Sequence, residues 1–323
     1  MTDKPPPACP FTAMIAVGPA DYETPRLVQL LEALYHYEPG VSRVVLIDDA
    51  MTPRDLLGPL PTPPASCSVE VVKSPRQGRG EPRMGGGTVV MLTGIKHAAT
   101  GDVGRFLVKL DTDALIVAPF SGKLAALVDA RPDTGIVGAC YTSPNGKPRG
   151  DQHHRRVFGN ATKLLLPHGE RKSVGRRRRF PTTLKEWRLL RITRRAKRAG
   201  CTLGENVAGG AYAVTGEAIK RIKHAGLLDD VELWLETFAI EDGVIPLYAK
   251  MLGLTLVDHV KAGEVFGVVY RGLPAMPDEI VSLGYSIVHC TKNDERVSEA
   301  DIYAFFAERR NNVVAAEFGS LSP

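Results

Sequence analysis

Along this chain, continuous runs of hydrophobic residues alternate with segments whose hydrophobic residues recur at the spacing of a helix. Four apolar runs predict buried strands: residues 12–17, 43–47, 69–72 and 105–110. Leucines at helical spacing within residues 27–34 predict a helix after the first run, and a second helix is expected at residues 88–99, after a glycine-rich turn at 85–87. Strands that alternate with helices predict an α/β fold, with a mixed, mostly parallel sheet flanked by helices.

The second half of the chain resumes this pattern after an interruption. A helix is expected at residues 121–130 and a strand at 135–141, followed by a long loop over residues 142–181 and a helix at 183–200. Further strands are expected at residues 207–214, 254–257, 265–270 and 286–289. The expected N-caps, whose side chains accept hydrogen bonds from the first helical turn, are Thr24, Ser121, Thr183, Thr215, Asp242 and Ser298.

Composition indicates a soluble, loop-rich enzyme, with 44% hydrophobic and 24% charged residues. The five cysteines are scattered and form no Cys-x-x-Cys pair, which argues against a zinc site and a disulfide framework and favours a reducing cytoplasm. The N-terminus lacks the layout of a signal peptide, and no run of about 18 apolar residues occurs. We expect a cytoplasmic protein, or one that is peripheral on the membrane.

Charge is distributed unevenly. The net charge is +5, but residues 146–200 hold 18 Lys and Arg against 3 Asp and Glu, so this stretch carries +15 and the remaining residues together carry −10. On the expected helix 183–200, four arginines share one face beside an aliphatic stripe, with Trp187 nearby. We therefore expect residues 171–198 to contact an anionic acceptor or an anionic membrane surface. Nucleic acid is less favoured, because no aromatic residues are interleaved with the charge.

Two carboxylates separated by one residue follow the predicted strand at 105–110, at Asp111 and Asp113. Open α/β sheets bind ligands beyond the carboxyl ends of their strands. Carboxylate oxygens are the ligands that Mg²⁺ and Mn²⁺ prefer, and a diphosphate can fill the remaining coordination positions. An Asp-x-Asp pattern alone is also common in solvated acidic turns, so the neighbouring segments must decide between the two interpretations.

In their order, these segments resemble the nucleotide-binding half of GT-A glycosyltransferases, in particular the inverting, family 2-like members. A strand ending in Asp48 and Asp49 is followed by the glycine-rich turn and helix, and then by residues 106–113 with the Asp-x-Asp motif. Residues 208–212 resemble the glycine-containing strand beside the donor sugar in these enzymes.

The resemblance covers residues 12–140 and 205–290, while residues 18–20 and 142–200 depart from it and leave the acceptor open. It implies a GT-A fold with a basic insertion. The expected parts are a proline-rich leader (1–11), a nucleotide-sugar-binding half (12–141), a basic loop and helix insertion (142–204), and an acceptor-side half with the C-terminal helix (205–323).

The resemblance also implies a cofactor and a donor. A divalent metal, Mn²⁺ or Mg²⁺, would be held by Asp111 and Asp113, with His289 as a third ligand through its neutral imidazole. The donor would be a nucleotide-diphosphate sugar, with a UDP-sugar favoured. The substrate-binding residues implied or expected are Asp48, Asp49, Arg83, Asp111, Gly209, Gly210 and Lys292.

Glu241 and Asp242 resemble the acidic pair that supplies the catalytic base, and we expect Asp242 to be the base. The alternative for Asp242 is a helix N-cap placed for stability alone. Two other functions remain open from the sequence. A sugar-phosphate nucleotidyltransferase would need a basic glycine-rich loop after the first strand, where this chain has only residues 18–21. A non-catalytic basic protein that binds lipid or nucleic acid is the third.

Overall fold

The computed structural model describes most of the chain, namely residues 9–52, 54–79, 84–150, 183–202 and 204–319, without the side chains of residues 313–319. Its strands are β1 (Phe11–Val17), β2 (Val41–Asp48), β3 (Ser68–Lys73), β4 (Phe106–Asp111), β5 (Ala114–Ile116), β6 (Thr134–Gly138), β7 (Ala211–Thr215), β8 (Thr255–Asp258), β9 (Phe266–Val268) and β10 (Ile287–His289). Its helices are α1 (Glu23–Tyr37), α2 (Gly85–Ala98), α3 (Ser121–Ala130), α5 (Leu184–Arg198), α6 (Gly216–His224), the 3₁₀ turn η2 (Val231–Trp234), α7 (Glu241–Met251), α8 (Pro277–Leu283) and α9 (Glu299–Gly319).

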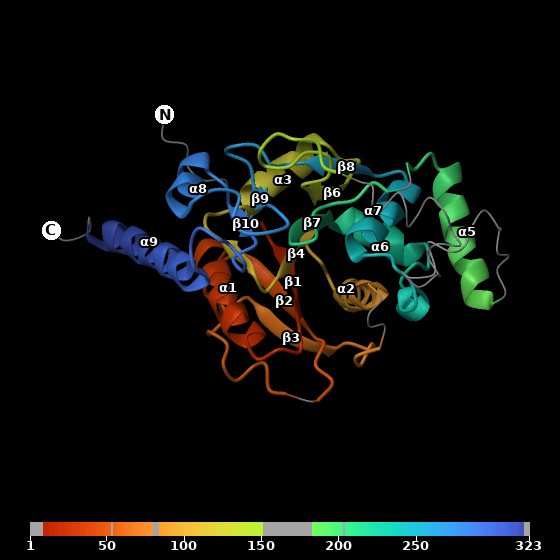
Figure 1. Cartoon of the computed structure of the whole chain (residues 1–323), viewed down its shortest axis with the longest axis horizontal. Helices are drawn as coiled ribbons and strands as arrows, with labels where there is room; N and C mark the ends of the chain where they lie inside the picture. Colours follow the sequence, from red (N-terminus) through yellow and green to blue (C-terminus); the bar gives the residue numbers. More distant parts are fainter. Residues whose placement is uncertain (1–8, 53, 80–83, 151–182, 203, 320–323) are drawn as a thin grey trace.

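The central sheet has seven strands in the order β3-β2-β1-β4-β7-β6-β8. All neighbours in it are parallel except at β7, which runs antiparallel to both β4 and β6. A second sheet orders its strands β5-β10-β9, with β10 antiparallel to β5 (Figure 1). The prediction of a mixed, mostly parallel sheet flanked by helices is confirmed.

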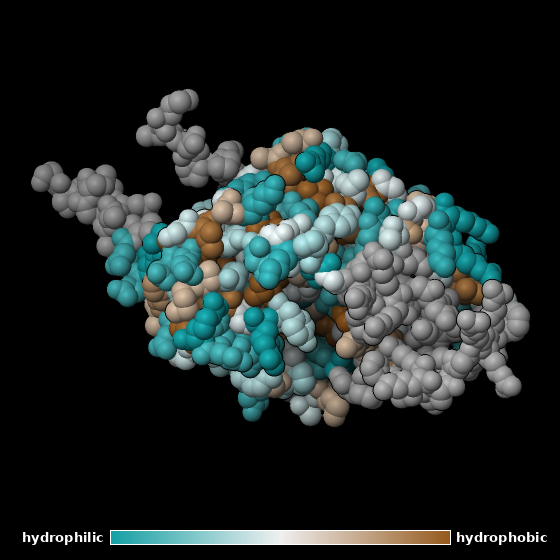
Figure 2. Space-filling view, turned by 45° about the horizontal axis from the view of Figure 1, so that its top comes forward, coloured by the Kyte–Doolittle hydropathy of each residue, from teal (hydrophilic) through white to brown (hydrophobic). Residues whose placement is uncertain are grey.

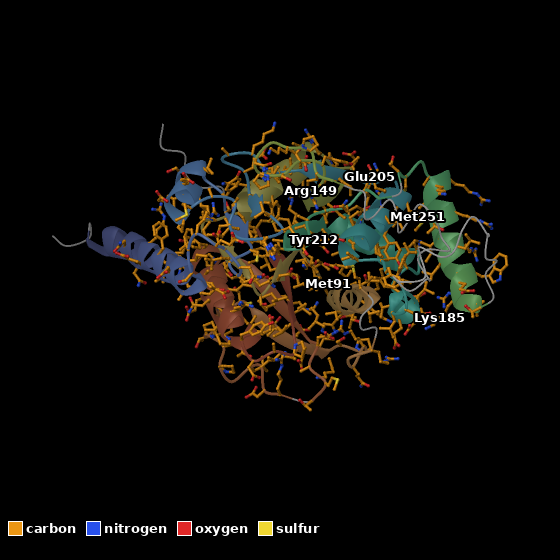
Figure 3. All side chains as sticks on the ribbon, viewed as in Figure 1. Met91, Arg149, Lys185, Glu205, Tyr212 and Met251 are labelled. Carbon is orange, nitrogen blue, oxygen red and sulfur yellow. The ribbon has the colours of Figure 1, made fainter. Side chains whose placement is uncertain are left out.

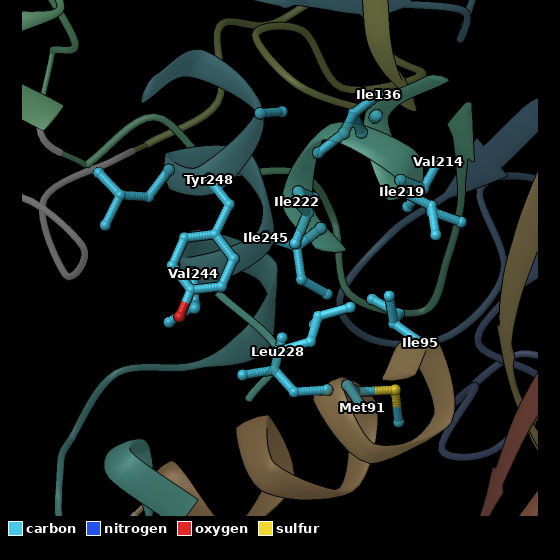
Figure 4. Close-up of a cluster of buried hydrophobic side chains, with 14 of the residues drawn as sticks. Met91, Ile95, Ile136, Val214, Ile219, Ile222, Leu228, Val244, Ile245 and Tyr248 are labelled. Atoms are coloured by element: carbon cyan, nitrogen blue, oxygen red, sulfur yellow. The ribbon is translucent and has the colours of Figure 1, made fainter. Parts of the chain in front are cut away.

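Side-chain alternation along the strands divides the core in two. Ala13, Ile15 and Val17 of β1 face a core shared with α1, α3 and the second sheet, whereas Met14 faces a core shared with α2, α6 and α7. Figure 4 shows part of the second core, which includes Met91 and Ile95 of α2, Ile219 and Ile222 of α6 and Val244 of α7. Burial of both faces explains why β1, β2 and β4 read as nearly continuous apolar runs rather than as alternating ones, whereas the edge strand β3 is half-buried or exposed, unlike the buried strand expected there.

The helix starts were only partly predicted. Thr183 closes a capping box with Glu186, and Thr215 and Ser298 each accept a hydrogen bond from the backbone three residues on. The other three expected caps are wrong, because the N-cap positions are occupied by Tyr22, Phe120 and Ile240 instead of Thr24, Ser121 and Asp242. At α3, the buried carboxylate of Glu38 accepts from the backbone N–H groups of the first turn and replaces the missing cap.

Two further expectations need correction. Residues 85–87 do not form a turn but open α2, and Gly85 is needed for a close approach, since a Cβ there would lie 2.0 Å from the Trp234 carbonyl oxygen. The strand expected at residues 207–214 begins only at Ala211, which leaves Gly209 and Gly210 in the connection before it. Among the described residues, no helix is long and apolar enough to cross a membrane.

Candidate active site

The topology gathers the predicted acids at one edge of the central sheet. β4 ends at Asp111, beside the carboxyl end of β1, and antiparallel β7 starts at the same edge. The Asp111 amide donates to the Gly210 carbonyl (2.9 Å), which fixes the glycine connection beside the acid. His289, at the end of β10, pairs with Ala114 of β5, and so the second sheet brings a residue from far along the chain next to Asp113.

Three potential ligand atoms converge at this edge. The Nε2 atom of His289 lies 3.3 Å from Oδ1 of Asp113 and 3.9 Å from Oδ2 of Asp111. Nδ1 of His289 is 2.9 Å from the Val269 carbonyl oxygen, which can only accept, so Nδ1 carries a proton. Nε2 therefore either presents a lone pair to the two carboxylates or, in the imidazolium, donates to Asp113. A divalent ion can take the place of that second proton.

Each of the two carboxylates is held from its other side by a lysine. Lys109 Nζ lies 2.6 Å from Oδ1 of Asp111, and Lys292 Nζ lies 2.9 Å from Oδ2 of Asp113. Burial alone would raise the pKa of Asp113, but the hydrogen bonds and positive charges of His289 and Lys292 outweigh burial and hold this pKa well below its usual range. Asp113 is therefore ionised at neutral pH.

Gly210 sets the position of the imidazole. A Cβ atom at this residue would lie only 2.2 Å from Cγ and 2.3 Å from Nδ1 of His289. The ring packs directly against the backbone of Gly210, and no larger residue fits there without moving it. Gly209, one residue earlier, faces the acidic pair instead, since its Cβ would lie 3.2 Å from Oε1 of Glu241.

Cys290 adds a sulfur atom to this cluster, since its Sγ lies within 4.8 Å of the ligand atoms of Asp113 and His289. Burial and the negative charge of Asp113 raise the pKa of the Cys290 thiol to about 12. The protonated Sγ lies 3.0 Å from the Lys292 carbonyl oxygen, to which it donates. A neutral thiol is a poor ligand for a hard ion. Asp111 stands beside this group of three, with its Oδ2 atom 3.9 Å from Nε2 of His289.

Lys109 joins the two acidic clusters, and the sequence interpretation missed it. Its side chain is fully buried in β4, where Nζ donates to Asp111 and to the Gly209 carbonyl oxygen, lies 3.9 Å from Oε1 of Glu241 and lies 5.7 Å from the centre of the Tyr212 ring. Burial lowers the pKa of Lys109, but the charges of Asp111 and Glu241 outweigh burial and raise it. The lysine is therefore a permanent cation in the sheet. A lone Lys within an otherwise apolar strand was the available signal.

Glu241 and Asp242 begin α7, and a Cβ on Gly209 would lie close to them just as one on Gly210 would lie close to His289. The pKa of Glu241 is raised by burial, against the attraction of Lys109. The pKa of Asp242 is raised well above its usual range, first by burial and then by the negative charge of Glu241. Burial thus raises the pKa of both neighbours, and they differ in their surroundings, since Glu241 lies beside the buried cation of Lys109.

A half-buried arginine, Arg149, lies close enough to Asp242 to act on its charge. Arg149 donates to the Ala139 carbonyl oxygen and, over 2.9 Å, to Oδ1 of Asn206, and its charge lowers the pKa of Asp242. Burial lowers the pKa of Arg149. Figure 3 shows Arg149 and Tyr212 near the middle of the molecule, away from Lys185 on α5. Arg149 lies in the expected long loop at residues 142–181, and the sequence gave no signal that it would act on Asp242.

The remaining candidate residues lie in different surroundings. Asp48 accepts from Arg54 (3.0 Å) and Lys73 (2.9 Å), and these contacts outweigh burial and lower its pKa. Asp49 pairs with Arg76 at 3.3 Å. Both aspartates are thus held by cations at the ends of β1, β2 and β3. Arg83 lies outside the described residues.

No family model matches this chain, and no curated protein matches its sequence. Among solved structures, an active-site mutant of LgtC is similar at a TM-score of 0.45, over 93% of this chain and 96% of that chain. The galactosyltransferase LgtC in complex with donor and acceptor sugar analogs gives 0.47, over 94% and 96%. The bifunctional glycosyltransferase WbbM in its apo form gives 0.46, over 96% of this chain and 51% of that chain. All three share 11% sequence identity with this chain, and at these values the similarity assigns neither residues nor substrates.

Proposed function

We propose that this chain is an inverting, metal-dependent glycosyltransferase of the GT-A type, which moves a sugar from a nucleotide-diphosphate donor, a UDP-sugar favoured, to a hydroxyl acceptor. The observation that carries the proposal is the pairing of two acidic clusters across Gly209 and Gly210. One cluster has the composition of a hard-metal site, and the other holds an acid with a raised pKa. Such a pairing suits a reaction that needs charge neutralisation on one side of a sugar and proton removal on the other.

Asp111, Asp113 and His289 would hold the ion. Asp113 and His289 fit it, because a carboxylate oxygen faces an imidazole nitrogen at 3.3 Å and the other ring nitrogen is tied to a carbonyl. Oδ2 of Asp111 lies 3.9 Å from the same imidazole nitrogen and would complete the set. When bound, the ion would neutralise the negative charge of the departing nucleotide diphosphate. Lys292, whose side chain is 43% exposed, can turn from Asp113 to a phosphate oxygen.

Asp242 would remove the proton of the acceptor hydroxyl as that oxygen attacks the sugar. A base works best when its pKa lies near the working pH, and burial together with Glu241 raises the pKa of Asp242 in that direction. Lys109 would keep Glu241 ionised beside it and would orient Asp111 through its second oxygen. Lys109 and Glu241 are positioning groups, since neither needs to touch the reacting atoms.

The first test is a thermal-shift screen of UDP-, GDP- and CMP-sugars with and without Mn²⁺. A ligand that binds only the folded state adds about 2.7 kcal/mol at a hundredfold excess over its dissociation constant, which is a visible shift. We expect a Mn²⁺-dependent shift that is lost in Asp113→Asn and reduced in Asp111→Asn. Glu308→Gln, which neutralises an exposed acid on α9, is the matched control.

Product formation with the stabilising donor then tests the reaction itself. Glycosyl transfer or slow donor hydrolysis that requires the metal supports the proposal. A donor shift of equal size in wild type and Asp113→Asn would contradict the metal assignment. A sugar-phosphate nucleotidyltransferase would instead release pyrophosphate from a nucleoside triphosphate and a sugar phosphate, so a pyrophosphate assay separates the two enzyme classes.

A further inference from the structure

The arginine-rich surface of α5 has no role in the site described above. The exposed arginines of this helix line an open groove together with Leu184 and Trp187, namely Arg188, Arg191, Arg194, Arg195 and Arg198. In Figure 2 the end of the molecule that α5 occupies in Figure 1 shows mainly hydrophilic side chains. We call this groove and its lining the α5 surface.

The inner face of α5 is not available to a partner. Leu189, Thr193 and Ala196 are buried, and the helix packs on α7 through this side. Leu189 and Ala196 of the aliphatic stripe belong to the core of the protein and are not available to a membrane. The expected contact of residues 171–198 with an anionic partner stays a prediction, and residues 171–182 lie outside the described residues. What remains exposed is the row of arginines and the first turn of the helix.

The positive charge of the α5 surface continues onto α6. Arg195 also lines a second shallow groove with Lys220, Lys223 and His224 near the end of α6. Between the two helices, Arg188, Arg191 and Arg195 stand at the rim of a pocket of about 240 Å³, whose floor includes Leu227, Leu233 and Met251. The combined surface is a basic rim around small apolar areas.

Few carboxylates compensate this charge. Arg188 pairs with Asp230 at 2.6 Å, and Glu186 is engaged in the capping box. Within the part of the chain that the structure describes, the other four arginines of the α5 surface have no carboxylate oxygen within 4.0 Å. Unpaired cations gathered on one face attract a polyanionic partner.

Two large apolar side chains stand beside these cations. Leu184 is 76% exposed and Trp187 is 50% exposed, both in the first turn of α5. An exposed leucine gains nothing from a nucleic-acid backbone or a soluble anion, whereas leucine and tryptophan both gain by entering the headgroup region of a bilayer. The arginines together with the exposed Leu184 and Trp187 therefore favour an anionic membrane over a nucleic acid or a soluble anion.

We propose that the α5 surface docks the protein on a membrane that contains anionic lipids, with lipid phosphates among the arginines and with Leu184 and Trp187 in the headgroup layer. Each basic residue near an anionic bilayer contributes about fivefold to the binding constant, so three arginines contribute on the order of a hundredfold. The inference does not rest on the proposed function, because no residue of the α5 surface belongs to the candidate active site.

Tryptophan fluorescence gives a direct test on the full-length protein. The chain has two tryptophans, and Trp234 is fully buried, so a change in emission on contact with vesicles reports Trp187. We expect a blue shift with vesicles of phosphatidylcholine and phosphatidylglycerol, quenching when brominated lipids replace part of these, and no change with phosphatidylcholine alone. The affinity should fall with added salt, since the screening length shrinks from about 10 Å at 0.1 M to about 3 Å at 1 M.

Variants separate the parts of the surface. Replacing Arg191, Arg194 and Arg198 by Ser should weaken vesicle binding about a hundredfold. The matched control replaces three exposed cations elsewhere, Arg131, Lys261 and Arg309, by Ser, and it should change vesicle binding little. Leu184→Ser should weaken binding to vesicles but leave binding to heparin or RNA unchanged. Equal vesicle binding by wild type and the α5 triple variant, both folded by circular dichroism, would overturn the proposal. So would RNA binding by wild type without any response to anionic vesicles.

Discussion

Replacement of Gly210 by Ala is the sharpest probe of the proposed metal site at Asp113 and His289. The new methyl carbon would lie 2.2 to 2.5 Å from three ring atoms of His289. Ordinary contacts of a Cβ atom begin near 3.4 Å, so the imidazole must retreat by about 1 Å or rotate away, in a region packed as densely as a crystal. The backbone of Gly210 is not in the left-handed region, so the effect arises from this contact alone.

The displacement has two consequences of different size. Overpacking of this kind typically costs about 1–3 kcal/mol of the free energy of unfolding. The ring also loses one of two contacts that it makes in the wild-type protein. These are the hydrogen bond from Nδ1 to the Val269 carbonyl oxygen (2.9 Å) and the approach of Nε2 to Oδ1 of Asp113 (3.3 Å). Loss of such orienting contacts lowers metal affinity by about 10- to 100-fold. The fold should survive, and the metal affinity should not.

Titration calorimetry with Mn²⁺ measures the affinity, and urea unfolding measures the stability. Gly150→Ala is the matched control, because a Cβ there meets no atom within 4 Å and should change neither quantity. Gly209→Ala should have a milder effect, since its nearest neighbour is the flexible carboxylate of Glu241 at 3.2 Å. A folded Gly210→Ala protein with wild-type Mn²⁺ affinity would refute the role assigned to His289.

Two further predictions concern the acidic pair and the buried lysine. Asp242→Asn should lower turnover by about 10² to 10⁴. It should also raise the melting temperature at pH 8. Because the pKa of Asp242 is raised in the folded state, the stability contributed by its protonated form is present at low pH and is lost as pH rises through the folded-state pKa. Asn does not titrate and therefore has no such loss. A scan from pH 4 to 8 in which the two melting curves never separate would contradict this. Lys109→Met should lower the free energy of unfolding by about 3–5 kcal/mol, because it leaves Asp111 and Glu241 without their buried cation. Adding Glu241→Gln should restore part of this loss, which a double-mutant cycle by urea unfolding measures.

The fold could be predicted because its strands are marked locally. Residues 44–47 and 106–108 are apolar on both faces, since helices or the second sheet cover both sides of the strands they form. The acids at Asp111 and Asp113 could be placed for the same reason, because a strand end is a local feature of the sequence. Their partner His289 required more, since only the pairing of β10 with β5 brings it within reach.

The helix caps and the buried cations could not be predicted in the same way. Ser121 has the side chain of a good cap, but Glu38, more than 80 residues away, reaches the same amides and makes that side chain unnecessary. Lys109 lies within a predicted strand, and sequence alone does not show that two acids surround it. Arg149 lies in a stretch with no periodicity, and its contacts with Asn206 and Ala139 depend on how the chain returns beside β6. Long-range contacts decided each of these cases.

The corrected position of Asp242 bears on its interpretation. An N-cap aspartate would be explained by stability, but the cap is Ile240, and Asp242 lies in the first turn with its neighbour Glu241. The positive end of a helix favours a carboxylate and would lower its pKa, yet the pKa of Asp242 is raised, so burial and the repulsion of Glu241 are the stronger effects. Two adjacent acids that repel each other in a shielded place cost folding free energy. Natural chains retain such costs mainly at functional sites, and this supports the assignment of Asp242 to proton transfer rather than to structure.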